Sequence, residues 1–366
     1  MARIGFDGRA LASPAAGMRR YSQELFAALA RLDRSFTIVA VGPSSGTVVP
    51  KGIETIEPAS SLPTNVGWMF TGLPRTIRRA RLDAFHAPAY TTPYGIRPVV
   101  VTIHDVSYAR HPEWYPYKRD PFRRAFYRRS AVTADRIITD SAFSKSEIVD
   151  AYGVRPDSID VVPLAASTVM TPGPALPLPA GCPKRFLLHV GDLHARRNLE
   201  MLARALRAVR KRNPAHRSVS LVLAGVDRGV RADLETLGSG TDEPVPLIWF
   251  AGAIDESTLL ALYRSAAMLT YPSRYEGFGL PLLEAMSCGL PVVASAASSI
   301  PEVVGDAGVL LDPDDEAGWT GAIERILDDD AHARSMKVKG LARASEFSWE
   351  RTARETAAVY RKLLGA

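Results

Sequence analysis

Two carboxylates flank a glycine-containing turn in the segment SRYEGFGLPLLEAMSCGLP, residues 273–291. Its glycines allow the backbone to approach a ligand closely, and Pro281 suits the first turn of a helix. The free amides at such a helix start bind anions, and the helix dipole adds roughly 0.3–1 kcal/mol. We therefore expect a diphosphate at the amides, with Glu276 and Glu284 holding hydroxyl groups at the two ends of the same ligand. The residues assigned to this site are Glu276, Gly277, Phe278, Gly279, Leu280 and Glu284.

Two adjacent arginines, Arg196 and Arg197, follow the apolar run RFLLHVG, which ends at Gly191. Cations at the start of a helix oppose its dipole, which favours an anionic ligand over a solvated helix start. A planar guanidinium suits a diphosphate, although its reach differs from that of a lysine. A glutamate or an arginine standing alone would be interpreted as a solvated charge, so the prediction depends on the combination.

A histidine and an aspartate, His104 and Asp105, follow the apolar run VVVTI. A histidine at the end of a strand is more often a hydrogen-bonded structural residue than a catalytic one, and these residues alone leave that open. The acidic run at residues 312–315 contains Asp-x-Asp, a pattern that can bind a metal. Because it lies between a strand and a helix, we interpret it as turn and N-cap chemistry and predict no metal site.

Short apolar runs alternate with stretches of helical period, the pattern of parallel βαβ units. Five prolines in TPGPALPLPAGCPK interrupt this alternation, which then restarts. We predict an α/β protein with two doubly wound parallel-sheet domains, at residues 1–173 and 185–346, joined by a linker at 174–184 and followed by a helical segment at 347–366. Ligands of such sheets bind beyond the carboxyl ends of the strands, so we expect a cleft lined by both domains.

The charge is distributed unevenly along the 366 residues. Residues 1–180 carry 22 Lys and Arg against 15 Asp and Glu, whereas the remaining residues carry 23 against 24. This excess predicts an anionic partner for the first half. Two distant cysteines exclude a disulfide framework, and no apolar run is long enough to span a membrane. We expect a cytoplasmic protein.

The Glu-x7-Glu segment resembles the signature of the retaining GT-B glycosyltransferases of family 4. The resemblance covers some 350 residues, in order: SPAAGMRRYSQELFAALA, VVTIHDVSYARHPEWYP, IITDSAFSKSEIVDAYGV, LLHVGDLHARRNLEMLARAL and FSWERTARETAAVYRKLL. It implies a donor site in the C-terminal domain, an acceptor site in the N-terminal domain, and a final helix that crosses back to the N-terminal domain. Where the family usually has Arg-Lys-Asn, this chain has Arg-Arg-Asn, which keeps the charge of the diphosphate contact and changes its geometry.

The resemblance also implies residue roles. The implied catalytic residues are His104, Glu276 and Arg197. Gly191, Arg196 and Arg197 join residues 276–280 and Glu284 in donor binding. Gly17, Tyr21 and Asp105 lie on the acceptor side, and Asp105 fixes either its loop or the imidazole. No metal or other cofactor is expected.

The implied reaction transfers a sugar, with mannose from GDP-mannose as the preferred donor, to a glycan or lipid-linked glycan in surface polysaccharide synthesis. Two alternatives stay open: a phosphorylase or sucrose-phosphate-synthase-like enzyme of the same fold, and a non-enzymatic basic protein that binds membranes or nucleic acid. We expect no nucleic-acid partner.

Basic clusters account for much of the N-terminal charge, and they lie beside aromatic residues. This combination suits an interfacial helix on anionic lipid, at about 1 kcal/mol per cation, and a solvated face is the alternative. A partner expectation follows: an anionic membrane on the inner face of the plasma membrane, contacted by Arg75, Arg78, Arg79, Arg119, Arg123, Arg124 and Arg128.

Overall fold

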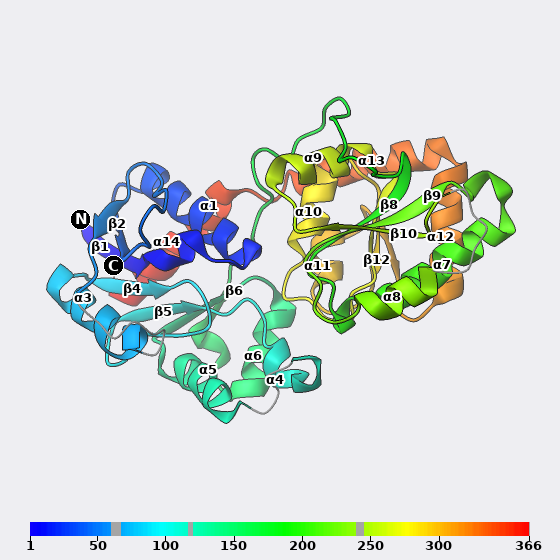
Figure 1. Ribbon diagram of the computed structural model, residues 1–366. Helices are drawn as coiled ribbons and strands as arrows, with labels where there is room; N and C mark the ends of the chain where they lie inside the picture. The colour runs from blue at the N-terminus through cyan, green and yellow to red at the C-terminus, as the bar shows by residue number, and fades with distance from the viewer. Residues whose placement is uncertain (60–66, 116–119, 239–244, 366) are drawn as a thin grey trace. The chain divides into compact units, whose positions relative to one another are not determined.

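A computed structural model describes residues 1–59, 67–115, 120–238 and 245–365 (Figure 1). The chain divides into two compact units, and the first of them contains both ends of the chain. One unit consists of Met1–Ala165 with Phe347–Ala366, and the other of Ala166–Glu346. The second unit begins at Ala166, so it includes the linker predicted at 174–184. Just before that segment, Arg264 Nε donates to the Thr171 carbonyl at 2.9 Å.

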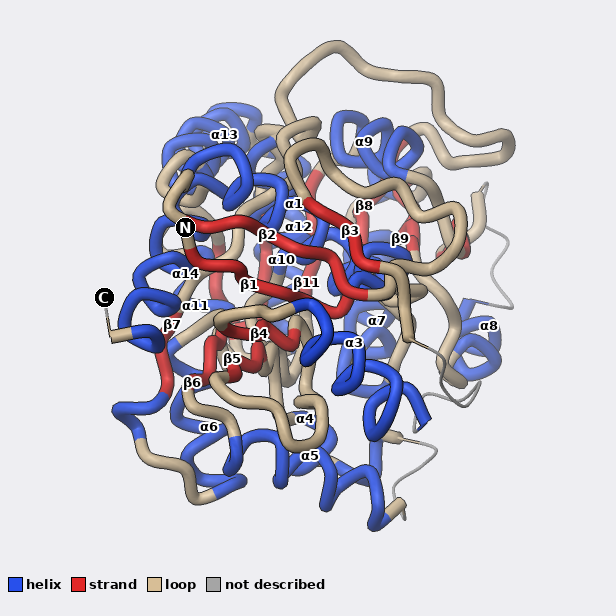
Figure 2. The backbone as a smooth tube through the Cα atoms, turned by 90° about the vertical axis from the view of Figure 1, so that its left-hand side faces the viewer, coloured by secondary structure: helices blue, strands red, loops and turns tan. Residues whose placement is uncertain are grey.

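The first unit contains a seven-stranded parallel sheet in the order β3-β2-β1-β4-β5-β6-β7, and Figure 2 shows its strands side by side. Its strands are β1 (Ala2–Asp7), β2 (Phe36–Val41), β3 (Glu54–Ile56), β4 (Ala84–Ala87), β5 (Val99–Thr102), β6 (Arg136–Thr139) and β7 (Ile159–Val161). Its helices are α1 (Ala16–Leu32), α3 (Leu73–Ala80), α4 (Ser107–Arg110), α5 (Pro121–Thr133), α6 (Ala142–Tyr152) and α14 (Trp349–Leu364). The strand order reverses between β1 and β4, which is where doubly wound sheets bind ligands.

The second unit repeats this plan with six parallel strands in the order β10-β9-β8-β11-β12-β13. Its strands are β8 (Arg185–Val190), β9 (Val219–Ala224), β10 (Ile248–Gly252), β11 (Met268–Tyr271), β12 (Val292–Ser295) and β13 (Val309–Leu311). Its helices are α7 (Leu199–Arg212), α8 (Arg231–Gly238), α9 (Glu256–Ser265), α10 (Leu280–Ser287), α11 (Ile300–Val304), α12 (Glu316–Asp328) and α13 (Asp330–Ala344). The order reverses between β8 and β11. The predicted fold class, two doubly wound parallel-sheet α/β domains, is confirmed.

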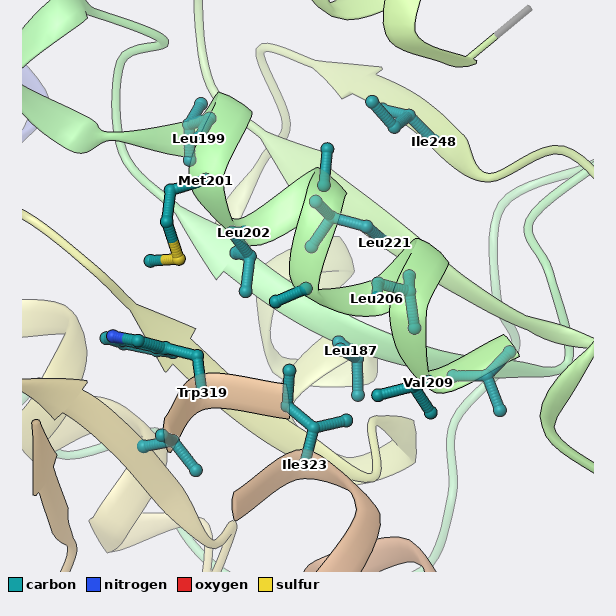
Figure 3. Packing of buried hydrophobic residues seen from close by; sticks show 14 of the residues in the cluster. Leu187, Leu199, Met201, Leu202, Leu206, Val209, Leu221, Ile248, Trp319 and Ile323 are labelled. Carbon is teal, nitrogen blue, oxygen red and sulfur yellow. The ribbon is translucent and has the colours of Figure 1, made fainter. Parts of the chain in front are cut away.

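Apolar side chains of α7 and α12 pack against the sheet of the second unit (Figure 3). Leu202 and Leu206 of α7, Leu187 of β8, and Trp319 and Ile323 of α12 are all completely buried. Helices cover both faces of a parallel sheet, and its strands are therefore continuous apolar runs in the sequence. This core fixes the ends of β8 and β11, where the predicted donor residues lie.

Helix boundaries follow local capping chemistry. Asp120 Oδ1 accepts a hydrogen bond from the Arg123 amide at 2.9 Å, which starts α5. Asp315 caps α12 in the same way, through the Gly318 amide at 2.9 Å. Asp312 accepts from the Asp314 amide at 2.8 Å, so two carboxylates of the acidic run make the expected turn and cap contacts.

The last helix, α14, packs against α1 in the first unit. Thr352 Oγ1 donates to the Pro163 carbonyl at 2.8 Å, and Tyr360 is completely buried beside His86. Residues from the end of the chain therefore complete the core of the first unit.

Candidate active site

Arg197 and Glu276 form a buried ion pair at the carboxyl ends of β8 and β11. These two strands flank the point where the strand order reverses, so the pair occupies the position at which such sheets bind ligands. The sequence placed both residues in the donor site, and the structure brings them into direct contact. Arg196 lies farther from the same carboxylate, at 3.9 Å.

The surroundings of Arg197 hold its guanidinium in one orientation. Nη1 donates to Tyr271 Oη, to Ser273 Oγ at 3.1 Å, and to Glu276. Burial lowers the pKa of the Arg197 guanidinium, and Tyr271 opposes this shift. Its Nε is buried and has no hydrogen-bond partner among the described residues, which leaves a donor for another acceptor.

Two glycines make room for this arrangement. A side chain at Gly191, whose φ is +132°, would place a Cβ 3.0 Å from Arg197 Nη2. A Cβ on Gly225 would lie 2.0 Å from the Gly191 carbonyl oxygen. The turn after β8 can therefore carry Arg197 inward only with glycine at both positions.

The Gly-Phe-Gly turn leads into α10 as the sequence predicted. Gly279 has φ +103°, a left-handed conformation, and Pro281 lies in the first turn of the helix. The first amides of a helix have no carbonyl partner within it, so residues 279 and 280 supply donors at this end. Ser299 Oγ donates to the carbonyls of Glu276, at 2.9 Å, and Phe278, at 3.1 Å, which fixes the turn.

Glu284, the second predicted carboxylate, is buried on α10 with 3% of its surface exposed. Tyr263 Oη donates to its Oε2 at 2.9 Å. The sequence did not predict this tyrosine contact. A ligand diol would therefore meet a carboxylate that Tyr263 already orients.

Tyr271 contacts the Arg197 guanidinium, and His189 packs against Tyr271. Sequence reasoning missed both residues. The His189 ring stacks on Tyr271 with 5.5 Å between centroids, and its Nδ1 donates to the Thr270 carbonyl at 3.1 Å. Burial, together with the nearby Arg197 charge, lowers the pKa of His189 to about 3. A neutral histidine inside the strand therefore adds no charge beside Arg197.

In the first unit, His104 is paired with Asp140. His104 follows β5 and Asp140 follows the adjacent β6, and His104 Nδ1 donates to Asp140 Oδ2 at 2.8 Å. Burial opposes protonation of His104, but the Asp140 carboxylate outweighs it and raises the pKa above 6.5. The sequence offered Asp105 for the imidazole or for the loop. The structure places Asp105 Oδ1 on the Ser107 amide, at 2.9 Å, so it orders the loop.

Behind His104 lies a buried chain of polar groups. The Tyr21 ring meets the imidazole edge-on, with centroids 4.8 Å apart, and its hydroxyl bonds to Thr102 Oγ1 at 2.7 Å. His86 Nε2 reaches the same Thr102 oxygen at 2.7 Å, and His86 Nδ1 reaches Tyr360 Oη at 2.7 Å. Tyr21, predicted on the acceptor side, is 2% exposed and supports His104 from within the core.

Gly17 lies in the first turn of α1 and is exposed. An added Cβ there would meet nothing within 4 Å. Its local backbone therefore gives no reason for a glycine, in contrast to Gly279.

Within the described ranges, no group of three or more His, Cys, Asp and Glu side chains is arranged to hold a metal ion. No helix of those ranges is both long enough and apolar enough to cross a membrane.

Two family models match the chain. Glycosyltransferase Family 4 matches residues 15–169, and Glycosyl transferases group 1 matches residues 184–329. The chain is 36% identical over 291 residues to O-antigen chain mannosyltransferase B of Escherichia coli. The aligned region covers 76% of this chain and 74% of that protein. It spans 53% to 66% of the length of six further curated relatives.

Solved structures share the fold at lower identity. Sucrose-phosphate synthase from Thermosynechococcus elongatus superposes with a TM-score of 0.77, at 21% identity and with both chains fully covered. The Anabaena protein Alr3699/HepE in complex with UDP-glucose gives a TM-score of 0.70 at 17% identity, over 99% of this chain and 100% of that one.

Proposed function

The chain belongs to the family 4 glycosyltransferases, and on that premise we propose that it transfers mannose from GDP-mannose to a glycan or lipid-linked glycan hydroxyl in surface polysaccharide synthesis. The observation that carries the proposal is the buried Arg197–Glu276 pair at the switch point of the second sheet. The name of the Escherichia coli relative supports mannose as the sugar and an O-antigen chain as the acceptor.

In the proposed donor complex, the diphosphate lies at the amides of residues 278–280 and at Arg196 and Arg197. The unpartnered Arg197 Nε supports this assignment, because a buried N–H without an acceptor is costly. Glu276 orients the transferred sugar, and Glu284 binds the ribose. Each charge-assisted hydrogen bond to the leaving diphosphate contributes on the order of 1.5–3 kcal/mol.

The proposed reaction retains the configuration at the anomeric carbon. The bond from C1 to the phosphate oxygen breaks, and the acceptor oxygen forms its bond to C1 on the same face. The departing phosphate takes the acceptor proton, so no protein nucleophile is required. His104, held by Asp140, binds the sugar or the acceptor hydroxyl, and the cations and amides take the place of a metal.

The arginines of α3 and α5 support the proposed contact with anionic membranes. Arg75, Arg79, Arg124 and Arg128 are exposed and have no acidic partner among the described residues. Phe122 beside them is 85% exposed. Arg119, also expected at this surface, lies outside the described residues. We propose peripheral attachment to the inner face of the plasma membrane.

Thermal unfolding with GDP, UDP and their sugars tests the donor site. We expect GDP and GDP-mannose to raise the Tm, since a ligand at 100 times its Kd stabilises by about 2.7 kcal/mol. Arg197→Ala should reduce this shift. If no nucleotide changes the Tm, the donor site is misassigned.

Product analysis tests the reaction itself. The product formed from GDP-mannose should show retained anomeric configuration by NMR, and excess EDTA should leave the rate unchanged. Inversion would contradict the mechanism, and a loss of rate restored by added metal would contradict the proposed metal independence. Transfer to fructose 6-phosphate or to inorganic phosphate instead would identify one of the alternative activities.

A further inference from the structure

The first unit contains a pocket of about 1140 Å³ that the donor site does not explain. It is lined by the loop after β1, the loop after β4, the segment at residues 69–73 and α5 as far as Arg129. Because β1 and β4 flank the reversal of strand order in the first sheet, the pocket lies where a doubly wound sheet binds its ligand. Its volume exceeds the usual range for a small molecule.

Most of the pocket wall is apolar. Met18 and Met69 line it together with Phe70 and Phe126, whose rings stack with 5.5 Å between centroids. Methionines adapt to flexible hydrocarbon, whereas a sugar chain would leave hydroxyl groups unpaired against such a wall. The wall therefore fits a hydrocarbon chain better than a glycan.

Three arginines line the pocket, and their partners distinguish them. Arg9 is paired with Asp7 at 2.6 Å, and Arg123 with Asp120 at 3.5 Å. Arg129 has no acidic partner in the described part of the chain, and its buried Nη1 makes no hydrogen bond there. This guanidinium lies over the Tyr94 ring, 4.7 Å from its centroid, so it is held in place and lacks only an anion.

The pocket adjoins His104. Tyr90, which lines it, meets the His104 ring edge-on with centroids 6.2 Å apart and stacks on Tyr127 at 5.4 Å. The wall of the pocket at Tyr90 is therefore in contact with the imidazole assigned to the reaction.

We propose that this pocket binds the hydrocarbon chain of a phosphorylated lipid that carries the acceptor, with the phosphate on Arg129 and the linked sugar extending past Tyr90 toward His104. This inference rests on the proposed function and specifies its acceptor as a lipid-linked one. The apolar wall and a single unpaired cation match the two parts of such an amphiphile.

Calorimetric titration of the full-length protein with farnesyl monophosphate, below its micelle concentration, tests the site. We expect saturable 1:1 binding, at least tenfold weaker binding of farnesol, and none of inorganic phosphate at the same concentrations. Absence of saturable farnesyl monophosphate binding would overturn the proposal. So would equal affinity for methyl mannoside, which would identify a sugar site, or displacement of the lipid by equimolar inorganic phosphate, which would identify a plain phosphate site.

Variants separate the headgroup from the chain. Arg129→Gln should weaken farnesyl monophosphate at least tenfold and leave farnesol unchanged, and Arg129→Lys should recover part of the loss. Ala125→Trp, at an exposed pocket residue, should weaken both ligands. Arg155→Gln, on an arginine of the same unit that is 86% exposed, is the matched control and should bind as the parent does. Equal losses in Arg129→Gln and Arg155→Gln would contradict the role of Arg129.

Release of GDP from GDP-mannose, measured on the same preparations with a water-soluble mannoside acceptor, distinguishes this inference from the proposed function. A protein that releases GDP but does not bind farnesyl monophosphate overturns the lipid site alone. A protein that binds the lipid as expected but releases no GDP overturns the proposed function and leaves the lipid site standing.

Discussion

The charge of Glu276 has two roles: it neutralises the buried Arg197 cation, and it is assigned to orient the transferred sugar. Its carboxylate is the counter-ion of Arg197, which is 7% exposed and lies against Tyr271 and Ser273. Removing one partner of a buried ion pair leaves the other charge unpaired, and this usually costs more than the pair contributes. The catalytic and structural roles of Glu276 must therefore be separated experimentally.

We predict that Glu276→Gln lowers turnover at least 100-fold and lowers the free energy of unfolding by on the order of 3 kcal/mol. A double variant that also carries Arg197→Met should recover stability, because it no longer contains an unpaired buried cation. It should not recover turnover. Glu316→Gln breaks an exposed pair with Arg204 and should change stability by less than about 1 kcal/mol. Chemical denaturation and steady-state rates measure both quantities. Full turnover in Glu276→Gln would contradict the assignment.

We predict that the stability of the protein varies with pH through the His104 imidazole, whose pKa Asp140 raises. Because the folded pKa of His104 is raised above 6.5, protonation stabilises the folded state fully below pH 6.5, and this stabilisation is lost as the pH rises through the folded pKa. Asp140→Asn removes the cause, so burial then lowers the pKa. Urea unfolding from pH 5 to 9 should show this loss of stability in the parent, whereas the His104 contribution in the variant should make stability rise with pH, because the folded pKa then lies below the unfolded one. The pH–rate limb that follows His104 should move to lower pH.

An unchanged pH–rate profile in Asp140→Asn would contradict a positioning role for Asp140.

Sequence reasoning missed Asp140 because its pairing with His104 depends on the order of the strands in the sheet. The aspartate follows RIIT as His104 follows VVVTI, and only the adjacency of β5 and β6 brings the two loops together. An aspartate directly after a neighbouring strand was the available signal.

At the scale of elements, two glycines at helix starts are expected to respond oppositely to alanine. Gly279 has φ +103°, and its Cβ would lie 2.7 Å from Leu282 Cδ1. Gly17 has open space around it, and alanine favours a helix over glycine by roughly 0.5–1 kcal/mol. The first position requires glycine for the fold, and the second does not.

We predict that Gly279→Ala lowers the Tm and the GDP-induced shift, whereas Gly17→Ala raises the Tm and still lowers turnover, because a ligand occupies the space beside residue 17. Melting curves with and without GDP, and transfer rates, check both variants. Normal turnover in Gly17→Ala would remove Gly17 from the acceptor side.

Strands with strong apolar runs were predictable from the sequence. The apolar runs FTIVAV and RIIT form β2 and β6, and α14, from Trp349 to Leu364, lies within the helical segment predicted at 347–366. The edge strand β3 was not predicted, since its three residues ETI carry no alternation and are mostly exposed. Motif spacing placed Arg197 and Glu276 in one site, but their direct pairing across 79 residues required the structure.

At the scale of the whole molecule, the basic excess of the first half has a physical test. We predict that the protein sediments with vesicles containing anionic phosphatidylglycerol, and that salt weakens this binding because it screens the exposed arginines. Replacing Arg124 and Arg128 together by glutamine should release protein at lower salt. Salt-insensitive binding, or equal binding to neutral phosphatidylcholine vesicles, would contradict an electrostatic attachment.

The packing of α14 into the first unit also bears on how the chain is made. Residues 347–366 leave the ribosome after every residue of the second unit, yet Tyr360 supplies the partner of His86 in the core of the first. The unit that emerges first therefore cannot complete its core until α14 has been synthesised, and the unit made second can fold before that. During translation His86 therefore lacks its Tyr360 partner, and α1 lacks the helix packed against it, until α14 has left the ribosome.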